Sequence, residues 1–220
     1  MIEVLYEDNH LIAVNKKSGD IVQGDKTGDT PLSDFVKAYI KKKYNKPGEV
    51  FLGTIHRLDR PTSGVVLYAR TSKALSRMNE QFREKKVQKT YWAVVEKTPP
   101  TESGTLENYL QKNQKQNKSY VTKSKGGKHA ILDYKLLRKL DNFFHLEIKP
   151  KTGRHHQIRV QLATIGCIIK GDLKYGAKRS NKDASIHLLA QKLEFVHPVT
   201  KEDITIVAPA PKESVWDACK

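Results

Sequence analysis

The sequence predicts an α+β fold in a single domain, residues 1–220. Short apolar stretches typical of strands stand near both ends of the chain, and segments between them repeat apolar residues at helical spacing. The sequence has no internal repeat and no linker-like change of composition. With 38% hydrophobic residues, the chain can build an adequate core for one domain.

The first expected elements are a β-hairpin and a helix. Strands at about residues 2–6 and 10–15 flank an Asp-Asn turn. The helix has Thr30 as N-cap and Pro31 in its first position, and Pro47-Gly48 marks its end. Its apolar residues recur at helical spacing: Leu32, Phe35, Val36, Tyr39 and Ile40.

A second helix is expected after Thr71 or Ser72, followed by a strand in "VQKTYWAVVE". The apolar face of this helix consists of Ala74, Leu75, Met78 and Phe82. Residues 98–128 are polar and predict an extended loop or a weak hairpin, either a plain surface loop or an insertion that contacts RNA. Strands resume in "HAILDYKLLRKL" and "FFHLEIKP".

The last expected elements are a helix and two strands. The helix is capped by Thr152 and runs to Gly166, with Ile158, Leu162 and Ile165 on one face. The strands lie in "IHLLAQKLEFVHP" and "EDITIVAPA".

The charge balance points to a polyanionic partner. Lys and Arg number 40 against 24 Asp and Glu, which gives a formal net charge of +16. The basic clusters are dispersed and interleaved with aromatic residues, as on a broad nucleic-acid surface, although each cluster alone could be a solvated helix face.

The cysteine count and the N-terminus indicate the compartment. Cys167 and Cys219 form neither a disulfide framework nor a thiolate zinc site. No apolar stretch approaches about 18 residues, and the N-terminus is acidic where a signal peptide is basic. We expect a soluble, cytoplasmic protein that does not engage a membrane.

The stretch "HRLDRPTSGVVLYA" places Asp59 between Arg57 and Arg60, ahead of a turn and an apolar strand. One interpretation is a structural ion pair, which contributes little at a surface. The other is a functional carboxylate displayed at the start of a loop, kept ionised by Arg159 from a separate helix.

Other catalytic machinery is disfavoured by spacing. His155 and His156 are adjacent and diverge on a helix, and the chain has neither a His-x-x-x-His nor a Cys-x-x-Cys motif. It also has no phosphate-binding loop, nucleophile elbow or dinucleotide fingerprint. We therefore predict no metal site, nucleotide hydrolysis or dinucleotide redox chemistry.

Several segments together resemble the RluA-type pseudouridine synthases. "HRLDRPTSGVVLYARTSKA" is similar to the catalytic motif of that family, and "KTYWAVV" to its Lys-x-Tyr segment. "VLYEDNHLIAVNKKSGDIV", "KPKTGRHHQIRVQLATIGCIIKGDLKYG" and "IHLLAQKLEFVHPVT" resemble its opening, Thr-Gly-Arg and closing motifs. The matches span most of residues 3–210 in the family's order.

The resemblance implies a central, mainly antiparallel sheet flanked by helices, with a catalytic cleft across it. It also implies isomerisation of uridine to pseudouridine without cofactor or metal. Asp59 matches the essential aspartate, and Tyr91 the active-site tyrosine, although Tyr91 alone reads as a core aromatic. Arg57 matches the arginine that fills the gap left by the flipped nucleotide. We assign substrate or RNA contacts to basic side chains of these motifs: Arg57, His56, Arg60, Lys89, Arg154 and His156.

The chain departs from the family pattern at two places. Lys17 stands where the family usually has a proline, and His155 replaces a small hydroxyl residue. The extra N-terminal S4 RNA-binding domain of many relatives is expected to be absent, so RNA affinity would come from the catalytic domain, with residues 111–128 as extra phosphate contacts. We expect a monomer without an obligate protein partner, acting on large-subunit ribosomal RNA or transfer RNA. A non-catalytic RNA-binding protein and a nucleoside hydrolase or glycosylase remain the alternatives.

Overall fold

The structure is a computed structural model that describes residues 2–24, 28–123 and 126–219. The described residues group into two compact units, the first formed by residues 1–88 and 190–209 and the second by residues 89–189 and 210–220. Both units combine strands and helices, which confirms the predicted α+β class. The assignment of residues 1–220 to one domain stays a prediction.

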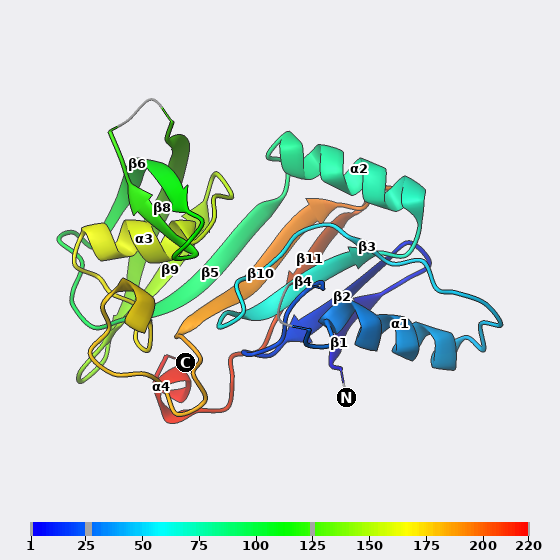
Figure 1. The fold of residues 1–220 in the computed structure, drawn as a ribbon, viewed down its shortest axis with the longest axis horizontal. Helices are drawn as coiled ribbons and strands as arrows, with labels where there is room; N and C mark the ends of the chain where they lie inside the picture. Colours follow the sequence, from blue (N-terminus) through cyan, green and yellow to red (C-terminus); the bar gives the residue numbers. More distant parts are fainter. Residues whose placement is uncertain (1, 25–27, 124–125, 220) are drawn as a thin grey trace. The chain divides into compact units, whose positions relative to one another are not determined.

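The first unit is built on a sheet with the strand order β1-β2-β4-β10, with β11 on β10 and β3 on β4 (Figure 1). The predicted hairpin is confirmed as an antiparallel pair, and β2 pairs antiparallel with β4 in turn. The two final strands are also confirmed as an antiparallel pair. The bounds of the strands are β1 Val4–Glu7, β2 Leu11–Lys16, β3 Gly53–Thr54, β4 Ser63–Ala69, β10 Leu188–Val196 and β11 Asp203–Val207.

Two helices accompany this sheet. Helix α1 (Leu32–Lys43) begins one residue later than predicted, because Pro31 is extended and serves as the N-cap. Its buried residues Val36 and Ile40 pack on the apolar side chains of β2 and β4. Helix α2 (Ser72–Arg83) begins as predicted, with the Thr71 hydroxyl accepting a hydrogen bond from Ala74 N at 3.2 Å.

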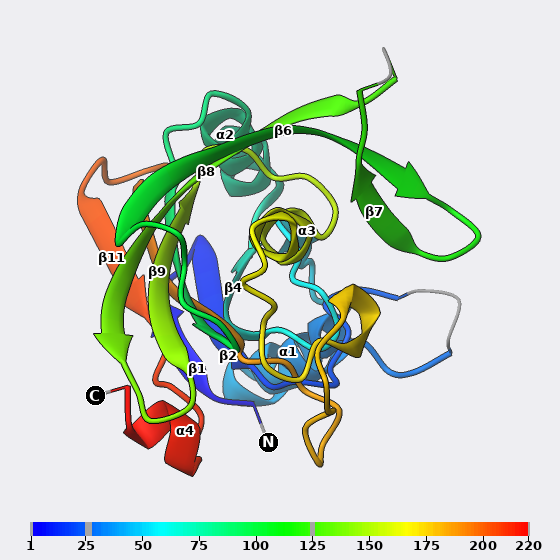
Figure 2. The ribbon, with the colours of Figure 1, turned by 90° about the vertical axis from the view of Figure 1, so that its left-hand side faces the viewer.

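The second unit has the strand order β5-β9-β8-β6-β7, with every adjacent pair antiparallel. Its strands curve around helix α3 (Gln157–Thr164), as Figure 2 shows. The 3₁₀ turn η1 (Leu173–Tyr175) and the short helix α4 (Ser214–Asp217) complete the unit. The bounds of the strands are β5 Gln88–Val95, β6 Ser103–Asn113, β7 Lys118–Val121, β8 Lys128–Lys139 and β9 Phe144–Pro150.

The polar stretch 98–128, of which residues 124 and 125 lie outside the described residues, is otherwise more regular than a loop or weak hairpin. Strand β6 is 11 residues long and pairs with both β7 and β8. Its outward side chains are polar, whereas Leu106 and Leu110 face the core. The low hydrophobicity of this stretch therefore reflects a strand that has one solvent-exposed face.

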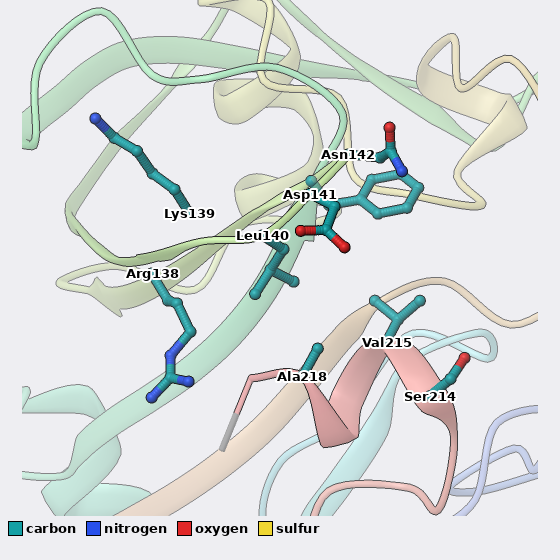
Figure 3. Close-up of a pocket in the computed structure, with 9 residues that line it drawn as sticks. Arg138, Lys139, Leu140, Asp141, Asn142, Ser214, Val215 and Ala218 are labelled. Atoms are coloured by element: carbon teal, nitrogen blue, oxygen red, sulfur yellow. The ribbon is translucent and has the colours of Figure 1, made fainter.

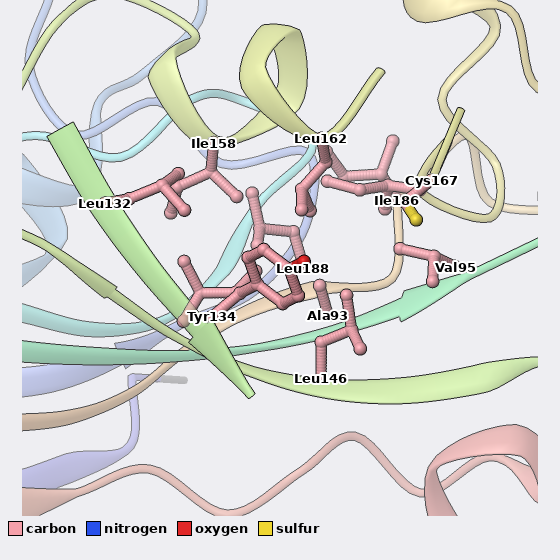
Figure 4. Close-up of a cluster of buried hydrophobic side chains, with 12 residues drawn as sticks. Ala93, Val95, Leu132, Tyr134, Leu146, Ile158, Leu162, Cys167, Ile186 and Leu188 are labelled. Carbon is pink, nitrogen blue, oxygen red and sulfur yellow. The ribbon is translucent and has the colours of Figure 1, made fainter. Parts of the chain in front are cut away.

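The core of the second unit lies between α3 and the strands (Figure 4). Ile158 and Leu162 project from α3 onto Leu132 and Leu146, and Ile165 packs at the margin of this cluster. The predicted apolar face of this helix is therefore confirmed. No helix in the described part of the chain is both long enough and apolar enough to span a membrane.

Candidate active site

Asp59 lies in the loop that joins β3 to β4, in the first unit. The loop runs from residue 55 to residue 62, and Thr62 N donates to the Asp59 carbonyl at 3.0 Å to close a turn ahead of β4. Arg57 is exposed, whereas Asp59 is half-buried. The Asp59 carboxylate therefore stands in a loop that leads into a strand, between the exposed side chains of Arg57 and Arg60.

A buried lysine, Lys16, holds this loop in place through hydrogen bonds to its backbone. Lys16 is 0% exposed, and its Nζ donates to the carbonyls of Lys17, Arg60 and Thr62 at 3.0, 2.9 and 2.7 Å. Burial lowers the pKa of Lys16 to about 8, while the carboxylates of Asp20 and, to a smaller extent, Asp59 act to raise it. Gly19 N also donates to the Arg60 carbonyl at 3.0 Å. The backbone around the candidate carboxylate is thus fixed by the second strand of the opening hairpin.

His56 and Arg60 have partners within the first unit. His56 Nε2 accepts a hydrogen bond from Leu67 N at 3.1 Å, and its ring stacks on Phe82 with centroids 5.3 Å apart. His56 therefore ties the loop to β4 and α2. Arg60 pairs with Asp29 at 2.7 Å, with both side chains about half exposed. Their predicted RNA contacts stay proposals.

The glycine of the Thr-Ser-Gly turn allows two strands to approach closely. Gly64 has φ of +116°, and a Cβ placed there would lie 2.2 Å from the Ala190 carbonyl oxygen. Only glycine accepts both this backbone conformation and this contact. The turn after Asp59 is therefore seated directly against β10.

Tyr91 and Arg159 lie in the second unit, whereas Asp59 belongs to the first. Tyr91 is half-buried on β5, opposite Ile148 of β9, and packs against the cluster that includes Ile158 of α3. Its ring thus lies at the margin of the core and not within it.

Arg159 forms a buried, two-pronged ion pair with Asp172. Nε donates to Oδ2 at 2.7 Å and Nη2 to Oδ1 at 2.8 Å, and the two side chains are 5% and 1% exposed. This geometry fixes the plane of the guanidinium group. Asp172 was not assigned a role from the sequence.

His156 and Tyr175 stand next to this pair. His156 has φ of 53° and precedes the first residue of α3, and its Nδ1 lies 3.0 Å from the Tyr175 hydroxyl. Burial, with Arg159 second, lowers the pKa of His156 to about 2, so its imidazole is neutral. The Tyr175 ring also lies 5.1 Å from the Arg159 guanidinium carbon. His156 therefore contacts Tyr175, whose ring lies beside the Arg159 guanidinium group.

The loop before α3 differs from the sequence prediction. Thr152 does not cap the helix, because its hydroxyl donates to Gln157 Oε1 at 2.7 Å and accepts from Ile131 N at 3.0 Å. The helix accordingly begins at Gln157, after His156. The helix is therefore shorter at both ends than the predicted one, which was capped by Thr152 and ran to Gly166.

The remaining predicted basic residues gather around this loop. Lys89 Nζ would lie 3.9 Å from a Cβ built on Gly153, and burial lowers the pKa of Lys89. Arg154 is exposed, and its Nε donates to the His129 carbonyl at 2.8 Å. Lys89 thus lies beside the Thr-Gly-Arg segment, to which Arg154 itself belongs.

Sequence reasoning missed Lys16, Asp172 and Tyr175. The signal for Asp172 was a single acid in the Lys-Gly-Asp segment after the apolar residues 167–169, thirteen residues beyond Arg159. Lys16 gave a weaker signal, since a lysine at the end of a buried strand usually reaches solvent. Tyr175 had the same Gly-Asp segment as its context.

Among residues 2–24, 28–123 and 126–219, no three His, Cys, Asp or Glu side chains gather as metal ligands would. A surface pocket of about 400 Å³ lies between the β8–β9 turn and α4, lined by Arg138, Asp141 and Ser214 among others (Figure 3). None of the predicted site residues lines it.

Comparison with known proteins gives a consistent result. The family profile of RNA pseudouridylate synthase matches residues 10–164. An uncharacterized RNA pseudouridine synthase of Synechocystis sp. is 33% identical over 216 residues, covering 96% of this chain and 66% of the relative. Ribosomal large subunit pseudouridine synthase C of Buchnera aphidicola subsp. Schizaphis graminum is 36% identical over 214 residues, covering 94% and 66%. The chain thus spans slightly less than two thirds of the length of these relatives.

A solved structure agrees with the sequence relatives. Human RNA pseudouridylate synthase domain containing 4 superposes with a TM-score of 0.80 at 25% identity, covering 96% of this chain and 89% of that one. The matched profile includes the loop of Asp59, strand β5 with Tyr91, and Arg159 of α3. This chain therefore belongs to the RNA pseudouridylate synthase family.

Proposed function

We propose that the protein is an RNA pseudouridine synthase, an isomerase that converts uridine in RNA to pseudouridine. The observation that carries the proposal is the loop of Asp59, held by the buried Lys16 inside the segment that matches the family. A clamped loop presents its carboxylate with little conformational freedom, which favours chemistry at one position of a bound nucleotide.

The reaction breaks the bond between ribose C1′ and uracil N1, turns the base in its pocket and joins C1′ to C5. The C5 proton leaves and N1 gains a proton, so substrate and product have the same composition. Asp59 supplies the ionised carboxylate for the sugar chemistry. Arg159 keeps Asp59 ionised, and Tyr91 packs against the base and assists removal of the C5 proton.

RNA enters this scheme through base flipping. Extruding a nucleotide costs a few kcal/mol of lost stacking and pairing. Arg57 is exposed two residues before Asp59, where its planar cation can fill the vacated position and pair with phosphate. His56, Arg60, Lys89, Arg154 and His156 complete the proposed RNA contacts, directly or by holding the loops that make them.

We favour large-subunit ribosomal RNA as the substrate over transfer RNA. The support is the name of the Buchnera relative, ribosomal large subunit pseudouridine synthase C. We further propose that the protein acts in the cytoplasm and needs neither a metal nor a cofactor. The net charge of +16 suits a ribosomal RNA substrate.

The test combines an activity assay with a matched variant. The purified protein is incubated with a transcript of large-subunit ribosomal RNA and, separately, with transfer RNA from cells that lack the protein. The RNA is then digested and its nucleosides are separated by chromatography. We expect pseudouridine with the wild type and none with Asp59→Asn, while RNA binding persists. Pseudouridine from the Asn and Ala variants would contradict the role of Asp59.

Two other outcomes identify the alternatives. Release of free uracil would indicate a glycosylase. RNA binding without any product from ribosomal or transfer RNA would indicate a non-catalytic binding protein.

A further inference from the structure

We infer that the outer face of β6, β7 and β8 is a stacking surface for unpaired nucleotides of the RNA substrate. This tyrosine face consists of Tyr109, Tyr120, His129, Lys118 and Arg154. The inference rests on the proposed function and adds a contact surface outside the candidate active site. All its residues belong to the second unit.

The strand register places the aromatic rings on one side of the sheet. Tyr109 of β6 stands opposite His129 of β8, and Tyr120 of β7 stands opposite Gln111, two residues along β6. Side chains two residues apart on a strand share a face, so Tyr109 and Tyr120 project to the same side. The Tyr109 and His129 rings lie 5.3 Å apart.

The opposite side of the same strands is covered by the core. Leu110, Ala130 and Ser119 are at most 4% exposed, and Leu110 and Ala130 pack with Val160 of α3. Tyr109 and Tyr120, by contrast, are 53% and 41% exposed. Two large rings thus stand in solvent on the face opposite the one that packs against the core at Leu110, Ser119 and Ala130.

Strand β7 and the turn before it are held in place by hydrogen bonds to other parts of the second unit. Ser119 N donates to the Tyr175 hydroxyl at 3.0 Å, and the Ser119 hydroxyl lies 2.8 Å from His155 Nδ1. Lys174 Nζ donates to the Asn117 carbonyl at 3.2 Å. These contacts fix β7 and its turn to the segment that carries α3 and η1. The strand that carries the Tyr120 ring is therefore ordered before a ligand arrives.

The charge around the rings selects an anionic partner. Residues 108–128 contain six lysines and no acidic residue. One of these lysines, Lys125, lies outside the described residues. Lys118 Nζ is 5.1 Å from the Tyr120 ring, and Arg154 is anchored at the edge of β8 through the His129 carbonyl. The nearby acid Glu107 is paired with His129 at 2.6 Å.

Exposed rings interleaved with cations fit single-stranded RNA better than a duplex. Each base offers a face for stacking on tyrosine, while lysines follow the phosphates. In a duplex the bases are stacked on one another, and such a surface could reach the backbone alone. The class of ligand is therefore unpaired RNA beside the uridine to be modified.

The experiment measures binding of a fluorescently labelled, unpaired 12-nucleotide uridine-rich RNA to the full chain by anisotropy. We expect Tyr109→Ala and Tyr120→Ala to weaken binding about fivefold or more each, whereas Tyr109→Phe and Tyr120→Phe remain within about twofold of the wild type. The salt dependence should stay unchanged in these variants. Lys118→Gln should instead reduce the slope of log K against log salt by about 0.7.

Phe35→Ala is the matched control, because Phe35 is 52% exposed on α1, outside the tyrosine face. It should bind RNA as the wild type does, and thermal unfolding checks that each variant is folded. Should an alanine variant fail to fold, Tyr109→Ser and Tyr120→Ser replace it.

Wild-type affinity in both alanine variants would overturn the inference. Equal loss of affinity for the single strand and for a duplex of the same sequence would also overturn it, since it would indicate backbone contact without stacking. Neither readout depends on turnover. Normal RNA binding by the tyrosine variants with pseudouridine still formed would refute this surface alone, whereas loss of binding in a protein without activity would refute the proposed function alone.

Discussion

Arg159 and Asp172 form a buried pair in which two guanidinium nitrogens meet two carboxylate oxygens at 2.7 and 2.8 Å. The pair fixes the orientation of Arg159 and satisfies a cation that is 5% exposed. Asp172→Ala should lower the free energy of unfolding by about 3 to 5 kcal/mol, because it removes one partner of a buried, doubly hydrogen-bonded ion pair. Urea denaturation measures this loss.

The more conservative Asp172→Asn keeps the shape but removes the charge. We expect a fall in kcat of about tenfold or more with a smaller change in KM, as for the loss of an interaction made in the transition state. The assay is run below the melting temperature of both proteins. Asp183→Asn is the control, since Asp183 is exposed and bonded to Ser185 of its own loop. Unchanged kcat in Asp172→Asn would show that the pair does not position Arg159 for the reaction.

Lys16 should be needed for the position of the Asp59 loop. Lys16→Met removes the donor to three carbonyls, including those of Arg60 and Thr62. We expect a loss of about 1 to 3 kcal/mol in stability and a lower rate of pseudouridine formation. Lys17→Met, next to it and exposed, should change neither. A Lys16→Met protein with the wild-type rate would argue against the clamp.

The Tyr175 hydroxyl should hold β7 in place. It accepts from Ser119 N at 3.0 Å and donates to the Ser119 carbonyl at 3.1 Å. In Tyr175→Phe the buried Ser119 N–H loses its partner, at a cost of about 1 to 3 kcal/mol. Hydrogen exchange of the β7 amides should become faster. The control is Tyr120→Phe, which removes an exposed hydroxyl and should leave these amides protected. Equal protection of the β7 amides in Tyr175→Phe and Tyr120→Phe would contradict the prediction.

His145 should make stability fall in acid. Burial, with Arg138 second, lowers the pKa of this 1%-exposed histidine from 6.5 to about 4. Between pH 6.5 and 4 the unfolded chain binds a proton that the folded protein does not, so stability present above pH 6.5 is lost as the pH falls. At pH 5 the loss from this group is about 2 kcal/mol.

The variant His145→Phe keeps a ring against Trp92, whose centroid lies 5.0 Å away. Urea denaturation at pH 7.5 and pH 5 should show a smaller difference for the variant than for the wild type. An identical difference would mean that His145 does not titrate as described.

Elements whose cause is local were predictable from the sequence. Helix α2 needs the Thr71 hydroxyl at its start and apolar residues such as Met78 on one face, and both stand within the segment itself. The opening hairpin likewise depends on a turn and two short apolar runs. The prediction for Asp59, which stays a proposal, also rested on a motif of a few consecutive residues.

Features that depend on distant partners were not predictable. Strand β6 is polar along its exposed face and becomes a strand because β7 and β8 pair with it. Thr152 has the composition of a helix cap, but its hydroxyl is engaged with Gln157 and Ile131. The partners of Lys16 and Arg159 lie 44 and 13 residues away, so spacing alone did not reveal them.

The close approach of Gly64 to Ala190 bears on how any mutational scan of this chain is interpreted. Substitutions at Gly64 would abolish activity as thoroughly as substitutions at Asp59, five residues earlier, yet for an unrelated reason. A side chain there collides with a neighbouring backbone, so the defect should appear as low yield of folded protein. At Asp59 the protein should accumulate normally and fail in the reaction. Abundance measured beside activity would therefore separate the residues that build the loop from Asp59, for which we propose a role in the reaction itself.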